Sequence, residues 1–144
     1  MAKPKLVVFD LGRARWRTAR AAGCACNREV GAVMERLRQD GILIAVASRT
    51  GEVEGANQLL HLFKLDQLLC QREIYTGSKV THFRRLKDGT GLQYNQMIFF
   101  DDEERNILEV GKLGVLSVLV PRGMTVKLLD DGLAEFSRRA AGGR

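Results

Sequence analysis

Short apolar runs alternate along the chain with segments in which apolar residues recur at every third or fourth position. Runs such as residues 6–9 are typical of strands that are buried on both faces of a sheet. The recurring pattern, as in residues 30–37, is typical of helices that cover such a sheet. The pattern predicts strands over 5–9, 42–47, 68–74, 97–100 and 115–120, and helices over 30–37, 53–63, 80–86, 107–110 and 126–136.

This alternation predicts an α/β fold, in which one doubly wound parallel sheet carries helices on both faces. A length of 144 residues with 45% hydrophobic residues suits a single domain over 1–144. Residues 11–28 are rich in Arg, Ala, Gly and Cys and lack a sustained period, which predicts an atypical loop or a poorly specified helix. Residues 138–144 should form a frayed tail. No apolar run approaches the roughly 20 residues of a membrane span, so we expect no membrane partner.

Polar and charged side chains stand where the predicted strands end. Asp10, Ser48 and the pair Asp101-Asp102 follow three of the strands, and ligands of parallel sheets bind beyond the carboxyl ends of the strands. Carboxylates that converge at one edge repel each other unless a cation lies among them, and hard oxygen ligands suit Mg²⁺. Ser48 could donate a hydrogen bond to a phosphate whose charge Lys79 would neutralise. The set predicts phosphoryl transfer, with a carboxylate as the nucleophile.

Each of these residues also has an ordinary structural role when it is considered alone. An Asp after a strand commonly forms a turn, and a Ser before a helix commonly caps it. Lys79 by itself fits a solvated charge, and the acidic residues 101–104 favour a helix N-terminus. Their joint occurrence at successive strand ends of one predicted sheet favours a common site.

The order and spacing of these motifs resemble the haloacid dehalogenase superfamily, and in particular its small capless phosphatases. The resemblance covers residues 5–10 and about 29–140. The motifs that carry it are Phe9-Asp10, Ala47-Ser48-Arg49-Thr50, Gly77-Ser78-Lys79 and Phe99-Phe100-Asp101-Asp102.

The resemblance implies a fold without a cap domain, the use of Mg²⁺ and a role for each matching residue. It also implies that the substrates are phosphotyrosine in proteins or sugar phosphates such as fructosamine phosphates. By position, Asp10 corresponds to the nucleophile, Ser48 and Lys79 to the phosphate-binding pair, Arg49 to a residue beside the substrate, and Asp10, Asp101 and Asp102 to the magnesium ligands.

The first motif departs from the superfamily pattern, which is Asp-x-Asp-x-Thr followed by a Leu-Trp pair. Trp16 matches, but Gly12 replaces the second Asp and Ala14 replaces the Thr. By resemblance, that second Asp is the general acid and base, and loss of such a group lowers the rate roughly 10²–10⁴-fold. Its backbone carbonyl also binds the metal, and Gly12 still supplies a carbonyl. We therefore expect a phosphatase with impaired turnover.

The altered first motif leaves three accounts open. The protein can be a weak phosphatase whose leaving group needs little protonation, or a catalytically silent relative that still binds Mg²⁺ and phosphate. The third account is that residues from Gly12 onward are an alternatively joined form of an ordinary phosphatase segment. The abrupt change in character at Gly12 favours this third account for the origin of the segment.

The excess positive charge lies wholly in the N-terminal quarter. Residues 1–38 hold nine Lys or Arg and three acidic residues, a net +6, whereas residues 39–144 are balanced. The arginines around Trp16 offer an alternative function, a module that binds nucleic acid or an acidic surface. Because the excess is confined to this unusual segment, a phosphorylated protein or sugar phosphate is the favoured partner, and nucleic acid is disfavoured.

The cysteine content and the motif order bear on location and on rival classes. Three cysteines form no even disulfide framework, which indicates a reducing compartment, and we expect a monomer in the cytoplasm. The Arg-rich start also resembles a mitochondrial transit peptide, but residues 6–10 are needed for the first strand. A response-regulator receiver uses similar residues in another order, with its acidic pair first, so this class is disfavoured.

Overall fold

A parallel sheet of five strands forms the centre of the computed structural model, which describes residues 2–10, 25–49, 51, 54, 57, 61 and 65–142. The strands are β1 (Leu6–Phe9), β2 (Leu43–Ser48), β3 (Leu69–Ile74), β4 (Met97–Asp101) and β5 (Leu116–Leu119). Their order across the sheet is β3-β2-β1-β4-β5, and every neighbouring pair is parallel.

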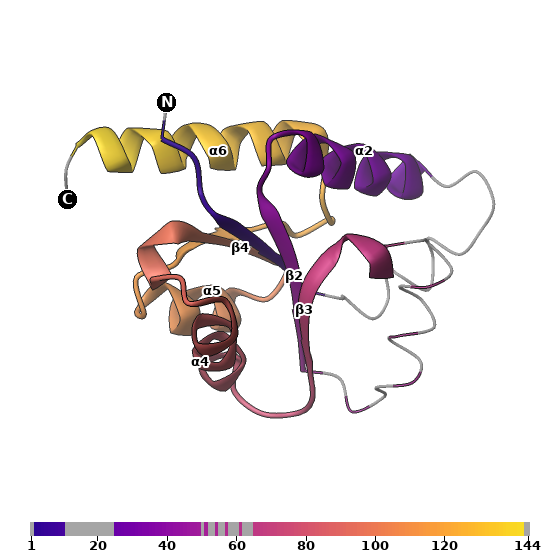
Figure 1. Cartoon of the computed structure of the whole chain (residues 1–144), viewed down its shortest axis with the longest axis vertical. Coiled ribbons are helices and arrows are strands. Elements are labelled where there is room, and N and C mark those ends of the chain that lie inside the picture. Colours follow the sequence, from indigo (N-terminus) through magenta and orange to yellow (C-terminus); the bar gives the residue numbers. More distant parts are fainter. Residues whose placement is uncertain are drawn as a thin grey trace.

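Within the described residues, helices cover both faces of the sheet (Figure 1). The helices α2 (Ala25–Gln39) and α6 (Val126–Ala141) lie on one face, while α4 (Lys79–Thr90) and α5 (Glu104–Gly111) lie on the other. Short 3₁₀ helices, η1 (Asp66–Leu68) and η2 (Tyr94–Gln96), precede β3 and β4. The predicted α/β fold with a doubly wound parallel sheet is confirmed.

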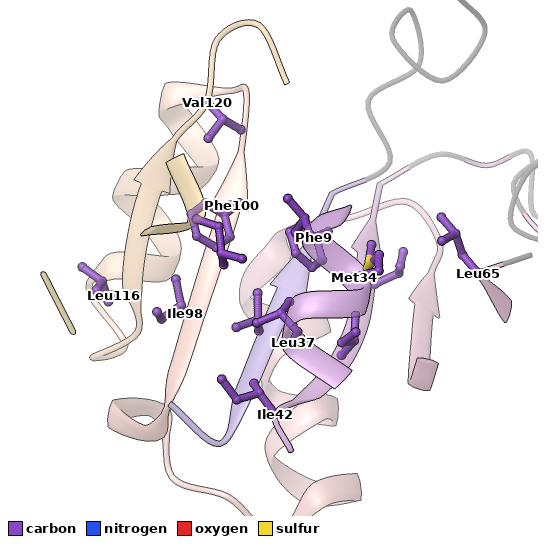
Figure 2. Close-up of a cluster of buried hydrophobic side chains, with 14 of the residues drawn as sticks. Phe9, Met34, Leu37, Ile42, Leu65, Ile98, Phe100, Leu116 and Val120 are labelled. Carbon is purple, nitrogen blue, oxygen red and sulfur yellow. The ribbon is translucent and has the colours of Figure 1, made fainter. Parts of the chain in front are cut away.

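Alternating side chains of each central strand enter two separate hydrophobic clusters. In β1, Val7 and Phe9 join the cluster under α2 and α6, whereas Leu6 and Val8 join the cluster under α4 and α5. Figure 2 shows the first cluster, in which Leu37 of α2 packs with these core side chains. Burying one such side chain contributes about 1.5–3 kcal/mol, so both faces of the central strands must be apolar.

Two predicted boundaries differ from the structure. Residues 25–28, the end of the segment predicted as an atypical loop or a poorly specified helix, are helical and belong to α2, while residues 11–24 lie outside the described residues. The predicted frayed tail over 138–144 is helical as far as Ala141. Glu135 accepts hydrogen bonds from Arg138 and Arg139 one turn later, and such pairs, with basic residues near the carboxyl end, stabilise a last turn.

Two other sequence predictions concern a helix and a membrane span. Of the predicted helix over 53–63, only residues 54, 57 and 61 are described. Among the described helices, none is long and apolar enough to cross a membrane.

A glycine in α6 makes room for the core ring of Phe100. An added Cβ at Gly132 would lie 2.9 Å from Cζ of Phe100, whose ring is buried and stacks on Phe9. We expect Gly132→Ala to lower the free energy of unfolding by about 1–2 kcal/mol, because overpacking outweighs the gain in helix propensity.

The matched control is Gly31→Ala in α2, where an added Cβ meets no atom within 4 Å. That variant should raise the free energy of unfolding by about 0.5–1 kcal/mol. Urea denaturation of both variants measures the contrast. Equal stabilisation by the two substitutions would contradict the close packing of Gly132 on Phe100.

Candidate active site

The carboxyl ends of β1 and β4 meet where the sheet changes winding direction. From β1 the chain proceeds outward to β2 and β3, and α4 then returns it across β1 to β4. Phe9 of β1 is paired with Phe100 of β4, so the residues that follow them, Asp10 and Asp101, are also neighbours. In open parallel sheets the ligand binds in the crevice at this switch point.

Strand periodicity places both carboxylates on the side of the sheet that α4 covers. Val8 and Phe99 belong to the hydrophobic cluster under α4 and α5, and Asp10 and Asp101 each follow two positions later in the same alternation. Lys79 is the first residue of α4 and lies over the same strand ends. The sequence thus brings two acids and one base together from three elements.

Lys79 binds both carboxylates directly. Its Nζ lies 3.0 Å from Oδ1 of Asp10 and 2.9 Å from Oδ2 of Asp101, and its side chain is fully buried. The same ammonium lies 4.8 Å from the centre of the Phe99 ring, which adds a cation–π contact. A buried charge is tolerated only when it is paired, so Lys79 orients the two acids as well as balancing part of their charge.

A third acid completes a cluster of oxygen ligands. Asp10, Asp101 and Asp102 each offer one carboxylate oxygen, and these oxygens lie within 4.8 Å of one another. Hard oxygen ligands that leave other positions open suit Mg²⁺. Because three carboxylates face one lysine ammonium, a divalent cation would also balance the remaining negative charge. The residues present therefore fit Mg²⁺.

The pKa values of two of these acids are shifted in the same direction. Burial raises the pKa of Asp10 to about 6; Lys79 opposes this shift and the neighbouring Asp101 adds to it. Burial also raises the pKa of Asp102, and its contact with Asp101 contributes. A cation bound among the carboxylates would lower both pKa values, because it stabilises the charged forms.

Asn106 was missed by the sequence reasoning, although it is a buried residue of the site. Its Nδ2 donates to Oδ2 of Asp101 at 2.9 Å, and its Oδ1 accepts from Nη1 of Arg49 at 3.4 Å. The backbone N–H of Glu103 donates to the other oxygen of Asp101 at 3.0 Å. Asn106 thus joins Asp101 to Arg49, and its only sequence signal is a polar residue on a helix face shared with Val110.

Ser48 ends the strand next to β1 and is buried. The register pairs Phe9 with Val46, so Ser48 lies at the same end of the sheet as Asp10, two positions beyond Val46. Gly12, the expected carbonyl ligand of the metal, lies outside the described residues. The structure therefore brings together the lysine and the three acids of the predicted site, Asp10, Lys79, Asp101 and Asp102. Asn106 joins Arg49 to this cluster. Ser48 lies at the end of the adjacent strand, β2.

Comparison with known proteins gives one family. Residues 19–139 match the acid phosphatase family. The chain is 43% identical over 159 residues to magnesium-dependent phosphatase 1 of Homo sapiens, covering 96% of this chain and 90% of that protein. It is also 33% identical over 96 residues to a HAD-like hydrolase superfamily protein of Schizosaccharomyces pombe, covering 60% of this chain and 55% of that protein.

Solved structures show the same fold at low sequence identity. The N-terminal part of a Bacteroides fragilis protein, which contains a phosphatase domain complexed with Mg, superposes with a TM-score of 0.72 at 17% identity, over 89% of this chain and 39% of that chain. A HAD-superfamily hydrolase of Ehrlichia chaffeensis has a TM-score of 0.66 at 12% sequence identity. The match covers 96% of this chain and 98% of that chain. These likenesses support the fold described above.

Proposed function

Because the chain belongs to the acid phosphatase family of the haloacid dehalogenase superfamily, and is therefore a phosphatase, we propose that it is magnesium-dependent and hydrolyses phosphomonoesters through Asp10. One observation carries the proposal: three carboxylates and a fully buried lysine converge at the switch point of the sheet. The human relative's name and the Mg complex of the Bacteroides fragilis protein support the choice of metal.

Asp10, Asp101 and Asp102 would hold the metal, together with the backbone carbonyl of Gly12. When bound, Mg²⁺ neutralises negative charge on the phosphoryl group and helps to align it. Lys79 and the hydroxyl of Ser48 would bind phosphate oxygens, and Arg49 would lie beside the rest of the substrate. The buried Asn106 would keep Asp101 and Arg49 in place.

Asp10 acts as the nucleophile in this mechanism. Its hydrogen bond to Lys79 holds the carboxylate in one orientation. One carboxylate oxygen forms a bond to phosphorus while the bond from phosphorus to the ester oxygen breaks, and the leaving oxygen takes a proton from water. Water then attacks phosphorus, which releases phosphate and restores the Asp10 carboxylate.

Gly12 has no side chain to protonate the leaving oxygen, so we infer that the nature of the leaving group controls turnover. A tyrosine hydroxyl has a pKa near 10 and leaves with little assistance, whereas a sugar hydroxyl is far more basic. We therefore propose phosphotyrosine in proteins as the better substrate of this chain and sugar phosphates such as fructosamine phosphates as slower ones.

A second candidate function is binding of Mg²⁺ and phosphate without turnover, which the loss of the acidic side chain at Gly12 favours. The basic-module alternative depends on arginines around Trp16 that lie outside the described residues, and it stays a prediction. The cytoplasmic location and the monomeric state likewise remain our expectations from the sequence.

Magnesium dependence tests the proposed function. Hydrolysis of an aryl phosphate should be lost in EDTA and restored by Mg²⁺, because the carboxylate cluster is incomplete without a cation. Mg²⁺ at about 100 times its Kd should also stabilise the folded chain by about 2.7 kcal/mol, which a rise in melting temperature reports.

The control is Asp102→Asn, which removes the exposed carboxylate of the cluster and should weaken both responses to Mg²⁺. Hydrolysis that is equal with EDTA and with Mg²⁺ would show that the proposal is wrong. Stabilisation by Mg²⁺ without any hydrolysis would select the second candidate function.

A further inference from the structure

The fully buried His82 contacts three backbone carbonyl groups. It lies on α4, three residues after Lys79, on the helix face that also carries Phe83 and Leu86. Its Nε2 lies 2.8 Å from the carbonyl oxygen of Ser48 and 2.9 Å from that of Tyr75. Its Nδ1 lies 3.0 Å from the carbonyl oxygen of Ser78. A helix face of this kind ordinarily carries apolar side chains, so the histidine has a role that packing alone does not supply.

The partners of the ring determine which nitrogen carries its proton. Carbonyl oxygens only accept hydrogen bonds, and a neutral imidazole has a single N–H. Two carbonyl oxygens face Nε2 and one faces Nδ1, so a proton on Nε2 lets the ring donate toward both Ser48 and Tyr75. The Tyr75 ring also stacks on His82, with 4.1 Å between ring centres.

Acidic groups approach the residues that His82 contacts. The Tyr75 hydroxyl donates to Oε1 of Glu73 at 2.9 Å, and the Ser78 hydroxyl lies 3.4 Å from Oε1 of Glu109. These contacts help to hold Tyr75 and Ser78, the residues that His82 contacts, in place. The charged and titratable groups around this region, from α4, β3 and α5 together, are Lys79, Arg85, Glu73, Tyr75 and Glu109.

The three carbonyl groups belong to three separate segments. Ser48 ends β2, Tyr75 follows β3, and Ser78 is the N-cap of α4, where its side chain accepts from the N–H of Val80. His82 therefore ties the end of one strand to the first turn of the helix that carries Lys79. The backbone bond from the Tyr75 N–H to the Ser48 carbonyl, at 3.1 Å, joins β2 to the residue after β3 but does not reach α4.

The contact at Ser48 also orients the next peptide group. The Ser48 carbonyl lies within hydrogen-bond distance of the His82 ring and accepts from the N–H of Tyr75, the residue that follows β3. Since a trans peptide is planar, the N–H of Arg49 points the opposite way, toward the side where β1 and Asp10 lie.

We propose that His82 is a positioning residue of the phosphate site. Its ring joins the Ser48 end of β2 to α4, the helix that carries Lys79, so that a hydroxyl, a backbone N–H and an ammonium converge on the same phosphate. This inference rests on the proposed function, because it requires that Ser48 and Lys79 bind phosphate.

The test measures the Kd of inorganic phosphate in the presence of Mg²⁺, with the KM and kcat for an aryl phosphate beside it. His82→Phe keeps a ring that can stack on Tyr75 but removes every donor, and it should weaken phosphate binding about tenfold or more. His82→Gln places an amide donor near the position of Nε2, and it should restore affinity to within about threefold of the unchanged chain.

Leu86→Ala is the matched control, since Leu86 is fully buried on the same face of α4 one turn further on. It should lower the melting temperature and leave the phosphate Kd unchanged below that temperature. If His82→Phe behaved in the same way, the positioning role would be overturned while the proposed function stood. If the unchanged chain bound no phosphate, the proposed function would fail, and this inference with it.

Discussion

Replacing Asp10 with asparagine should lower the turnover of an aryl phosphate by roughly 10⁴-fold or more, because an amide cannot act as the nucleophile. The fold should survive the change. Burial already raises the pKa of Asp10 to about 6, so its charged form is disfavoured there, and a neutral amide of the same size removes that cost. Lys79 also keeps its contact with Asp101. Initial rates and the melting temperature, measured on the same samples, separate loss of chemistry from loss of folding.

Asp88→Asn provides the matched control for this variant. Asp88 is an exposed carboxylate on α4, the helix that carries Lys79, and it is remote from the site at the other end of that helix. The control should keep full activity. Substantial turnover by Asp10→Asn would show that another group attacks phosphorus, and the mechanism proposed for Asp10 would then be wrong.

Introducing an acidic side chain at Gly12 should raise activity by roughly 10²–10⁴-fold for esters with poor leaving groups. Gly12→Asp supplies a carboxyl group that can protonate the leaving oxygen and then activate water. The gain should be smaller for an aryl phosphate, since an aryl oxygen leaves with little protonation. The ratio of kcat/KM for an alkyl phosphate to that for an aryl phosphate measures the effect directly.

Gly12→Asn separates the acid from the mere presence of a side chain, because its amide has a similar size and cannot donate the proton. This control should leave the alkyl-to-aryl ratio unchanged. A second check combines Gly12→Asp with Asp10→Asn, which should return activity to background. Equal and substantial rates in the original chain, in Gly12→Asp and in Gly12→Asn would refute the impairment that we infer from the first motif.

The apolar pattern predicted the sheet well because it is a local signal. Runs such as 97–100 must be apolar on both faces when helices cover both faces, and that requirement is visible in consecutive residues. Element ends were predicted less well. The last turn of α6 carries exposed ion pairs of Glu135 with Arg138 and Arg139, which the hydrophobic pattern does not show. The start of α2 lies in a segment without hydrophobic periodicity.

The sequence predicted which residues of the candidate site stand at strand ends, but not the contacts that these residues make with one another. The sequence shows that Asp10 and Asp101 follow buried runs, which places them at the ligand-binding edge of a parallel sheet. It contains no local signal that Asn106 links Asp101 to Arg49 or that His82 reaches Ser48. These contacts join residues far apart in the chain, so no periodicity or motif spacing within one element records them.

The sequence by itself thus determined the strands, the helices and the acids at the strand ends. Hydrophobic periodicity and the end of a strand depend on residues that are close together in the chain. Only the tertiary structure decided that the Lys79 ammonium is buried between two carboxylates 69 and 22 residues away in the chain. The physical reason is that strand alternation gives Asp10 and Asp101 the same side of the sheet, while the crossover through α4 brings the lysine over it. Neither condition exists until all three elements are packed together.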